Sequence, residues 1–88
     1  MPDHVNDAIV RRLKRANGHL EMIIEMVDKG RPCAEIAQQL QAVESAIESA
    51  KKSLIHDYIN RSLDQSATAP SSKARATVRE LKRITKYL

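Results

Sequence analysis

The chain has few of the residues on which strand-rich folds depend. It contains no Trp or Phe, two Tyr, two Gly and three Pro in 88 residues. Strands are enriched in aromatic residues, and the turns between them are rich in Gly and Pro. The apolar residues are instead mainly Ala, Ile, Leu, Val and Met, which suit helix packing. The composition therefore predicts an all-α protein, formed by one small domain over residues 1–88.

Further absences exclude several classes of protein. A single cysteine, Cys33, cannot form an internal disulfide, so we expect a reducing, cytoplasmic environment. No apolar run approaches the length that spans a membrane, and the first residues have no signal-peptide pattern. The sequence has no Ser/His/Asp set, no paired carboxylates on one face and no glycine-rich phosphate loop. We therefore expect a protein without a membrane partner that is not an enzyme.

Apolar residues recur at alternating spacings of three and four, the pattern of amphipathic helices. The pattern predicts helices over about residues 6–29, 32–63 and 72–87, with a linker over 64–71. Gly30 is a natural helix stop and Pro32 a natural first helical residue. Cys33 then falls in the first turn of the second helix, where the helix dipole and Arg31 would both favour a thiolate.

The second helix is too long for its own chain to cover, so we expect oligomerisation. At 100° per residue, Tyr58 and Ser62 share the helix face of Cys33 but lie roughly 40 Å along its axis. Two antiparallel copies of this helix that cross near Ala46, where small residues gather, would bring Cys33 of one copy beside Tyr58 and Ser62 of the other. The sequence thus predicts an effector site shared between subunits, unless Cys33 is only a small buried apolar residue.

Basic side chains are concentrated at the two ends of the chain. Residues 1–18 carry four basic and two acidic side chains, residues 19–70 five and eight, and residues 71–88 six and one. This pattern favours an anionic partner, and it suits phosphate contacts better than base reading. An alternative is a helical adaptor that meets an acidic protein or a membrane surface. The candidate DNA contacts are Arg11, Arg12, Lys14, Arg15, Lys51, Lys52, Arg79, Lys82 and Arg83.

Two segments resemble a known family of bacterial repressors. Residues 11–19 (RRLKRANGH) are similar to its basic R-x-[KR]-R-x-x-G-[QH] segment, and residues 33–43 (CAEIAQQLQAV) to its C-x-x-[IV]-x-x-Q-[IL]-x-A-[VI] pattern. The chain thus resembles, over nearly its whole length, the CsoR/RcnR/FrmR family of copper, nickel/cobalt and formaldehyde sensors. The resemblance implies a DNA-binding repressor without a helix-turn-helix, built as an all-α dimer with antiparallel pairing of the second helix that doubles to a tetramer.

The chain departs from the family at its effector positions. Tyr58 and Ser62 stand where the copper sensors have His and Cys and the nickel/cobalt sensors two His. A phenol and a hydroxyl replace poorly the imidazole and thiolate that copper and nickel favour. Glu44 also stands near the position of the family's helix-2 arginine, which puts part of the usual DNA surface in doubt.

Several effectors therefore stay open. Formaldehyde-sensing members use the amine of an N-terminal proline with this cysteine, and the chain retains both, as Pro2 and Cys33, provided that Met1 is removed. His4, Cys33 and the terminal amine would be the ligands of a transition metal ion (Ni, Co or Cu). Persulfide sensors use two cysteines, of which one is present here, and a repressor without an effector is the remaining alternative. His19 and His56 are expected to be ordinary residues of polar helix faces.

Overall fold

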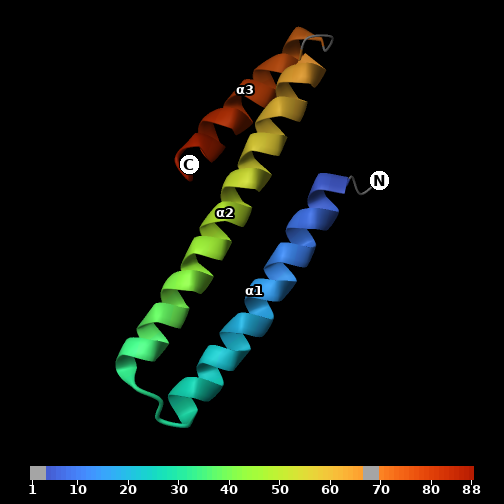
Figure 1. Cartoon of the computed structure of the whole chain (residues 1–88). Helices are drawn as coiled ribbons and strands as arrows, with labels where there is room; N and C mark the ends of the chain where they lie inside the picture. Colours follow the sequence, from blue (N-terminus) through green and yellow to red (C-terminus); the bar gives the residue numbers. More distant parts are fainter. Residues whose placement is uncertain (1–3, 67–69) are drawn as a thin grey trace. The chain divides into compact units, whose positions relative to one another are not determined.

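The computed structural model describes residues 4–66 and 70–88, and these residues form three α-helices. They are α1 (His4–Asp28), α2 (Cys33–Ser66) and α3 (Ser71–Thr85), shown in Figure 1. The described residues contain no strand, which confirms the all-α class. No helix among them is long and apolar enough to cross a membrane.

The helix ends differ from the expected ones by a few residues. α1 begins two residues earlier than expected, and α2 continues three residues past Leu63. Residues 64–66 contain neither Gly nor Pro, so nothing in the sequence breaks the helix there. Residues 67–69, the centre of the expected linker, lie outside the described residues.

The turn between α1 and α2 is built as the sequence predicts. Gly30 has φ +71°, a left-handed conformation that costs glycine little. The Gly30 N–H donates to the Val27 carbonyl (3.1 Å) and the Arg31 N–H to the Met26 carbonyl (3.0 Å). This pair of bonds is the Schellman motif, which satisfies carbonyl groups at the helix end. The chain therefore leaves α1 at a defined angle.

α2 begins directly after Pro32. The Pro32 carbonyl accepts the first bond of the helix from the Ile36 N–H (3.2 Å), and Cys33 is the first helical residue. The Arg31 guanidinium forms an ion pair with Glu35 across the first turn (2.8 Å). A carboxylate in this turn also interacts favourably with the helix dipole.

The chain divides into two compact units, one up to Lys51 and one from Lys52 onward. The N-terminal unit contains α1 and the first part of α2, which run antiparallel on either side of the Gly30 turn (Figure 1). Residues spaced seven apart are its buried apolar residues. They are Ile9, Ala16 and Ile23 on α1 and Val43 and Ala50 on α2.

The other half of each predicted apolar face is exposed. On α1, Leu13, Leu20 and Val27 alternate with the buried positions and keep 38–58% of their surface accessible. On α2, Leu40 and Ile47 are 40% and 45% exposed. The apolar residues that recur at spacings of three and four are therefore buried only at every second position. A single chain leaves an apolar stripe uncovered on each of the two helices.

The C-terminal unit contains the rest of α2 and α3. Within it, Ile55 and Ser62 are buried, whereas α3 has no buried residue. The Pro70 carbonyl accepts the first bond of α3 from the Ala74 N–H (3.0 Å). Val78 of α3 is 49% exposed. α3 is thus an amphipathic helix on which Val78 is exposed and Leu81 and Ile84 are half-buried.

Candidate functional site

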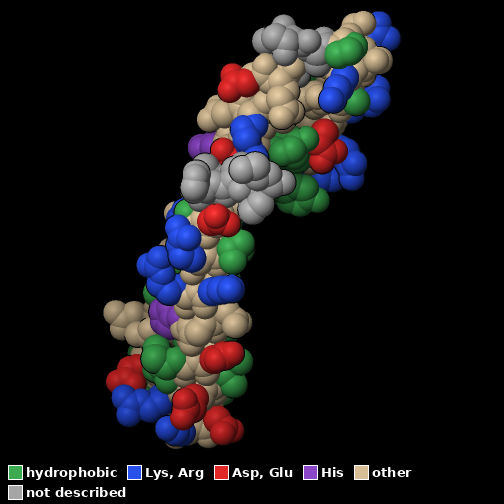
Figure 2. All heavy atoms as spheres, turned by 90° about the vertical axis from the view of Figure 1, so that its right-hand side faces the viewer, with side chains coloured by type: hydrophobic (Ala, Val, Ile, Leu, Met, Phe, Trp, Pro, Cys, Tyr) green, Lys and Arg blue, Asp and Glu red, His purple; other side chains and the backbone are tan. Residues whose placement is uncertain are grey.

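Basic residues dominate the first half of α1. Figure 2 shows Lys and Arg side chains gathered there, and Asp and Glu mixed with further Lys and Arg toward the turn into α2. Two of the basic residues, Arg11 and Lys14, are exposed. The other two, Arg12 and Arg15, line a cleft against α2. The four candidate DNA contacts on α1 therefore fall into two pairs with different surroundings.

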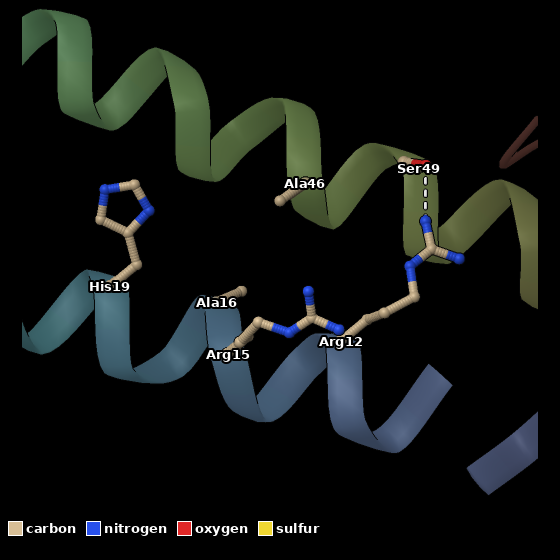
Figure 3. A pocket seen from close by; sticks show the side chains of 6 residues that line it. All are labelled: Arg12, Arg15, Ala16, His19, Ala46 and Ser49. Carbon is tan, nitrogen blue, oxygen red and sulfur yellow. Dashed lines mark hydrogen bonds between the residues drawn. The ribbon is translucent and has the colours of Figure 1, made fainter. Parts of the chain in front are cut away.

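The cleft lies between α1 and the first part of α2, and we call it the α1–α2 cleft. It has a volume of about 460 Å³ and is lined by Arg12, Arg15, Ala16, His19, Ala46 and Ser49 (Figure 3). Arg12 donates a hydrogen bond from its guanidinium to the Ser49 hydroxyl (2.6 Å). Arg12 and Ala16 are four residues apart, close to one helical turn, which puts them on one face of α1.

His19 closes one end of this cleft. Its Nε2 lies 2.6 Å from the Oε1 atom of Gln39, in a partly buried contact between α1 and α2. Which of the two groups donates in this bond depends on the tautomer of the imidazole. Figure 3 shows the ring extending from α1 toward α2. His19 thus links the two helices, and the expectation of an ordinary polar-face residue is wrong; His56 is exposed.

Cys33 is an exposed, free thiol in the first turn of α2. Its position agrees with the predicted helix start. The Arg31 guanidinium, however, is held by both its Nε (3.1 Å) and an Nη (2.8 Å) on the Glu35 carboxylate. The structure therefore gives the Arg31 charge a partner other than the thiol. Cys33 is accessible to a solution effector from its own chain's surface.

Tyr58 and Ser62 lie toward the far end of α2, in the C-terminal unit. Tyr58 is half-buried and Ser62 is 7% exposed. Between them in sequence, Arg61 pairs with the Asp57 carboxylate (2.7 Å). The structure describes one chain, so the predicted meeting of Cys33 with a second copy's Tyr58 and Ser62 stays a prediction.

The donor atoms do not form a metal centre within the described part of one chain. Over residues 4–66 and 70–88, no three His, Cys, Asp or Glu side chains gather at one point. Tyr58 and Ser62 offer only a phenol and a hydroxyl, which copper and nickel bind less readily than imidazole or thiolate. His4 begins α1, and Pro2 lies outside the described residues. A Cu or Ni site built on Cys33 would therefore need ligands beyond those that the described chain brings together.

The remaining candidate DNA contacts are surface residues. Lys51 is half-buried and pairs with Glu48 (3.1 Å), and Lys52 is exposed. On α3, Arg83 pairs with Glu80 (3.3 Å), while Arg79 and Lys82 are exposed. These pairs lie within single helices and near solvent, where ion pairs add little stability.

Sequence reasoning missed the residues of α2 that face Arg12 and His19. α2 contains many polar and small residues, and Gln39 and Ser49 are two of them. Nothing in their spacing along the sequence indicates that they contact α1. The signal that was present lies on α1. Arg12, Ala16 and His19 are spaced by four and three residues and so share one helical stripe.

Comparison with known proteins gives one family. A family model described as "metal-sensitive transcriptional repressor" matches residues 5–87. The copper-sensing transcriptional repressor CsoR of Mycobacterium ulcerans (strain Agy99) is 34% identical over 74 residues, which cover 84% of this chain and 62% of that protein. CsoR of Bacillus subtilis (strain 168) is 36% identical over 52 residues, 59% of this chain and 52% of that protein. The aligned parts thus cover less than two thirds of these relatives' lengths.

A solved structure agrees with the sequence matches over a larger share of the chain. The nickel-responsive transcriptional regulator InrS superposes with a TM-score of 0.79 at 28% sequence identity. The superposition covers 93% of this chain and 91% of that one.

Proposed function

Because the chain belongs to the family of metal-sensitive transcriptional repressors, we propose that it binds operator DNA and releases it when an effector reacts with or binds at Cys33. The match over residues 5–87 is the observation that carries this proposal. Membership of a family of transcriptional repressors also confirms the expectation that the chain is not an enzyme.

The basic residues of α1 and α3 supply the contacts with DNA in this proposal. Arginine and lysine bound to phosphates fix a protein on the duplex and carry no sequence information by themselves. The exposed basic residues of α1 and those that line the α1–α2 cleft would contact phosphates in different ways. Exposed Arg11 and Lys14 provide mobile charge, whereas Arg12, held by Ser49, provides a guanidinium in a fixed orientation.

Assembly of several copies supports the same function. Leu13, Leu20 and Val27 on α1 and Leu40 and Ile47 on α2 form exposed apolar stripes that a second copy would cover. Burial of apolar surface contributes roughly 25 cal/mol per Å², so covering these stripes favours association. We propose a homodimer that doubles to a homotetramer, as the resemblance to the family implies. Each basic surface is then repeated, which multiplies the phosphate contacts.

The effector site proposed for this assembly is built on Cys33 of one copy with Tyr58 and Ser62 of another. With His4 and the terminal amine, Cys33 would hold a Ni, Co or Cu ion, as in a metal-sensing member of the family. A bound metal would supply coordinate bonds that tie the thiolate to groups on a neighbouring segment. With the Pro2 amine, freed by removal of Met1, the same thiol would instead condense with formaldehyde: N–C and C–S bonds form to one CH2 group, and the aldehyde oxygen leaves as water with one proton from each nucleophile. In every case the effector changes helix packing between subunits and so couples two distant sites.

Fluorescence anisotropy with the promoter beside the protein's own gene tests the DNA-binding step. We expect saturable binding that is at least 10³-fold tighter than binding to a scrambled duplex of the same length, within the range for specific regulators. The affinity should fall steeply as salt rises from 50 to 200 mM, because phosphate contacts release counterions. Equal affinity for the promoter and the scrambled duplex would contradict the repressor and favour the helical adaptor.

A further inference from the structure

We propose that the outer face of α1 docks against the same face of α1 in a second copy of this chain, with the two helices antiparallel. The outer face is turned away from the buried residues of α1, since Gly18 at its centre lies about 160° around the helix axis from buried Ala16. Its exposed charged residues are Asp7, Arg11, Lys14, Glu21, Glu25 and Lys29. This contact is separate from the apolar stripes that the proposed homodimer covers, and it does not rest on the proposed function.

The charges of the outer face are arranged about Gly18, with opposite signs at matching distances. Arg11 and Glu25 each lie seven residues from Gly18, on opposite sides of it. Lys14 and Glu21 lie four and three residues from it, again on opposite sides. A two-fold axis through Gly18 therefore places Arg11 of one copy beside Glu25 of the second copy. The same axis places Lys14 beside Glu21 of the second copy, and it repeats each of these contacts.

A third pair of opposite charges lies at the ends of the same face. Asp7 and Lys29 each lie eleven residues from Gly18. The Lys29 N–H donates to the Glu25 carbonyl (2.9 Å), so Lys29 continues the helical turn directly after α1. Its ammonium group pairs with the Glu25 carboxylate (2.9 Å), and the two side chains are 67% and 62% exposed. Because an ammonium group has three hydrogens, Lys29 can keep this pair and also bind Asp7 of the second copy.

The order of charges along α1 is the reverse of the one that stabilises a single helix. The helix dipole favours acidic residues in the first turn and basic residues in the last. The last turn of α1 instead contains Glu25 and Asp28 and no basic residue. Figure 2, which views the molecule from the side of α1, shows Lys and Arg along the first half of the helix and Asp and Glu among the side chains nearer the turn. An antiparallel second copy offsets this unfavourable order, because its basic half lies beside the acidic half of the first copy.

Gly18 occupies the point where the two helices would cross. No atom of the described chain lies within 4 Å of a Cβ added there, so the fold of one chain does not require a glycine at this position. Glycine within a helix costs about 1 kcal/mol relative to alanine. A residue no larger than alanine at the crossing point lets the helix axes approach to about 8 Å, within reach of the flanking charges. Met22, which is 47% exposed, lies beside Gly18 on this face and adds apolar surface to the contact.

Sedimentation velocity of the full chain, at several protein and salt concentrations, tests for this docking. Salt screens ion pairs between exposed side chains, whereas it does not weaken the burial of apolar stripes. We expect a larger species at about 50 mM NaCl that dissociates at about 500 mM, where the smaller assembly held by the apolar stripes remains. A sedimentation coefficient that is independent of salt at the highest soluble protein concentration would overturn the proposal.

Two charge-reversal variants, Arg11→Glu and Glu25→Arg, test the register of the contact. Each variant alone brings like charges together at both symmetric contacts, so docking should weaken about tenfold or more. In an equimolar mixture of the two variants, every one of these contacts again joins a carboxylate to a guanidinium group. Docking in the mixture should therefore return to within about threefold of the wild type. If either variant docks as the wild type does, or the mixture docks no better than each variant alone, the proposed register is wrong.

Control variants separate this register from net charge. Arg79→Glu and Asp64→Arg make the same charge changes at exposed positions outside α1. Each should change docking by less than about twofold. Losses as large as those of the α1 variants would show that diffuse charge drives the association and would overturn the proposal. Circular dichroism checks that every variant keeps its helices.

Operator DNA gives a further readout, and this part rests on the proposed function. Arg11 and Lys14 are also candidate DNA contacts, so docking and DNA binding would use the same charges. A short operator duplex should therefore convert the larger species into the smaller, DNA-bound assembly. A larger species that persists with operator bound would contradict a docking contact on Arg11 and Lys14. If no operator is bound, the proposed function fails, and the mixing experiment, which contains no DNA, still decides this proposal.

Discussion

The first half of α1 and the whole of α3 both carry clusters of basic side chains, but their surroundings differ. On α1, Arg12 is held by Ser49 of α2 and shares a cleft with Arg15. On α3, within the described residues, the ion pair of Arg83 lies within the helix itself, and no residue of α3 is buried. Similar composition thus gives an arginine bonded to a second helix on α1, whereas on α3 the ion pair of Arg83 stays within its own helix. The difference teaches that charge counts alone do not locate a binding site.

The same contrast holds for the apolar residues. Ile23 of α1 is 2% exposed, whereas Val78 of α3 is 49% exposed. Ile23→Ala should therefore lower the free energy of unfolding by about 2–4 kcal/mol, through lost burial and the cavity left behind. Val78→Ala should change it by less than about 0.5 kcal/mol. Urea denaturation at several fixed protein concentrations measures both, since association contributes to stability.

A large effect of Val78→Ala would break this comparison. It would mean that α3 packs its apolar edge against another copy, and the loss should then depend on protein concentration.

Operator affinity should depend more on the basic residues of α1 than on those of α3. Arg12→Gln should weaken operator binding about tenfold and lower the slope of log K against log salt by about one. Arg79→Gln on α3 removes the same charge from an exposed side chain and should cost about threefold or less. Anisotropy at three salt concentrations measures both slopes. An equal loss in the two variants would mean that the contact of Arg12 with Ser49 adds nothing to DNA binding.

The two glycines offer a matched pair with opposite expected signs. Gly30 has a positive φ, so Gly30→Ala should destabilise the protein by about 1–2 kcal/mol. Gly18 is helical with no atom of the described chain within 4 Å of an added Cβ, so Gly18→Ala should stabilise it by up to about 1 kcal/mol. Thermal unfolding of both variants checks the signs. Destabilisation by Gly18→Ala would reveal a second copy packed against α1 at that point.

The smallest effect should come from the ion pair on α3. Arg83 and Glu80 lie 3.3 Å apart and are respectively 79% and 42% exposed. Glu80→Gln should change stability by less than about 0.5 kcal/mol, because exposed pairs are screened by water and salt. Operator affinity should stay the same or rise slightly, since an acidic residue is removed from a basic helix. A clear loss of affinity would show that Glu80 positions Arg83.

The sequence predicted the helices and the turn because their signals are local. Gly30 and Pro32 mark the helix ends through backbone geometry that needs no tertiary contact. The end of α2 was placed too early at Leu63, because a polar run resembles a linker when no glycine or proline marks the true end. The spacing of the apolar residues predicted which face of each helix is apolar. It could not show which residues of that face are buried within a single chain.

The candidate site was less predictable than the fold. Cys33 was located correctly at the start of α2, since its surroundings are set by neighbouring residues. His19 was assigned to a polar face and Arg12 only to a DNA contact, because their partners Gln39 and Ser49 are distant in sequence. Long side chains can turn toward a neighbouring helix from a flank of its apolar face. Only the fold brings these pairs together.

The account's central claim is that an effector acts at Cys33 to release operator DNA. The most direct measurement is operator anisotropy during titration with Cu(I), Ni(II), Co(II), formaldehyde and a polysulfide, for the wild type and for Cys33→Ala. We expect one of these to raise the operator Kd at least tenfold in the wild type. Cys33→Ala should bind operator equally well and no longer respond, because the thiol is remote from the α1 arginines in sequence and is exposed. Release that persists in Cys33→Ala, or operator binding that no effector disturbs, would contradict the claim.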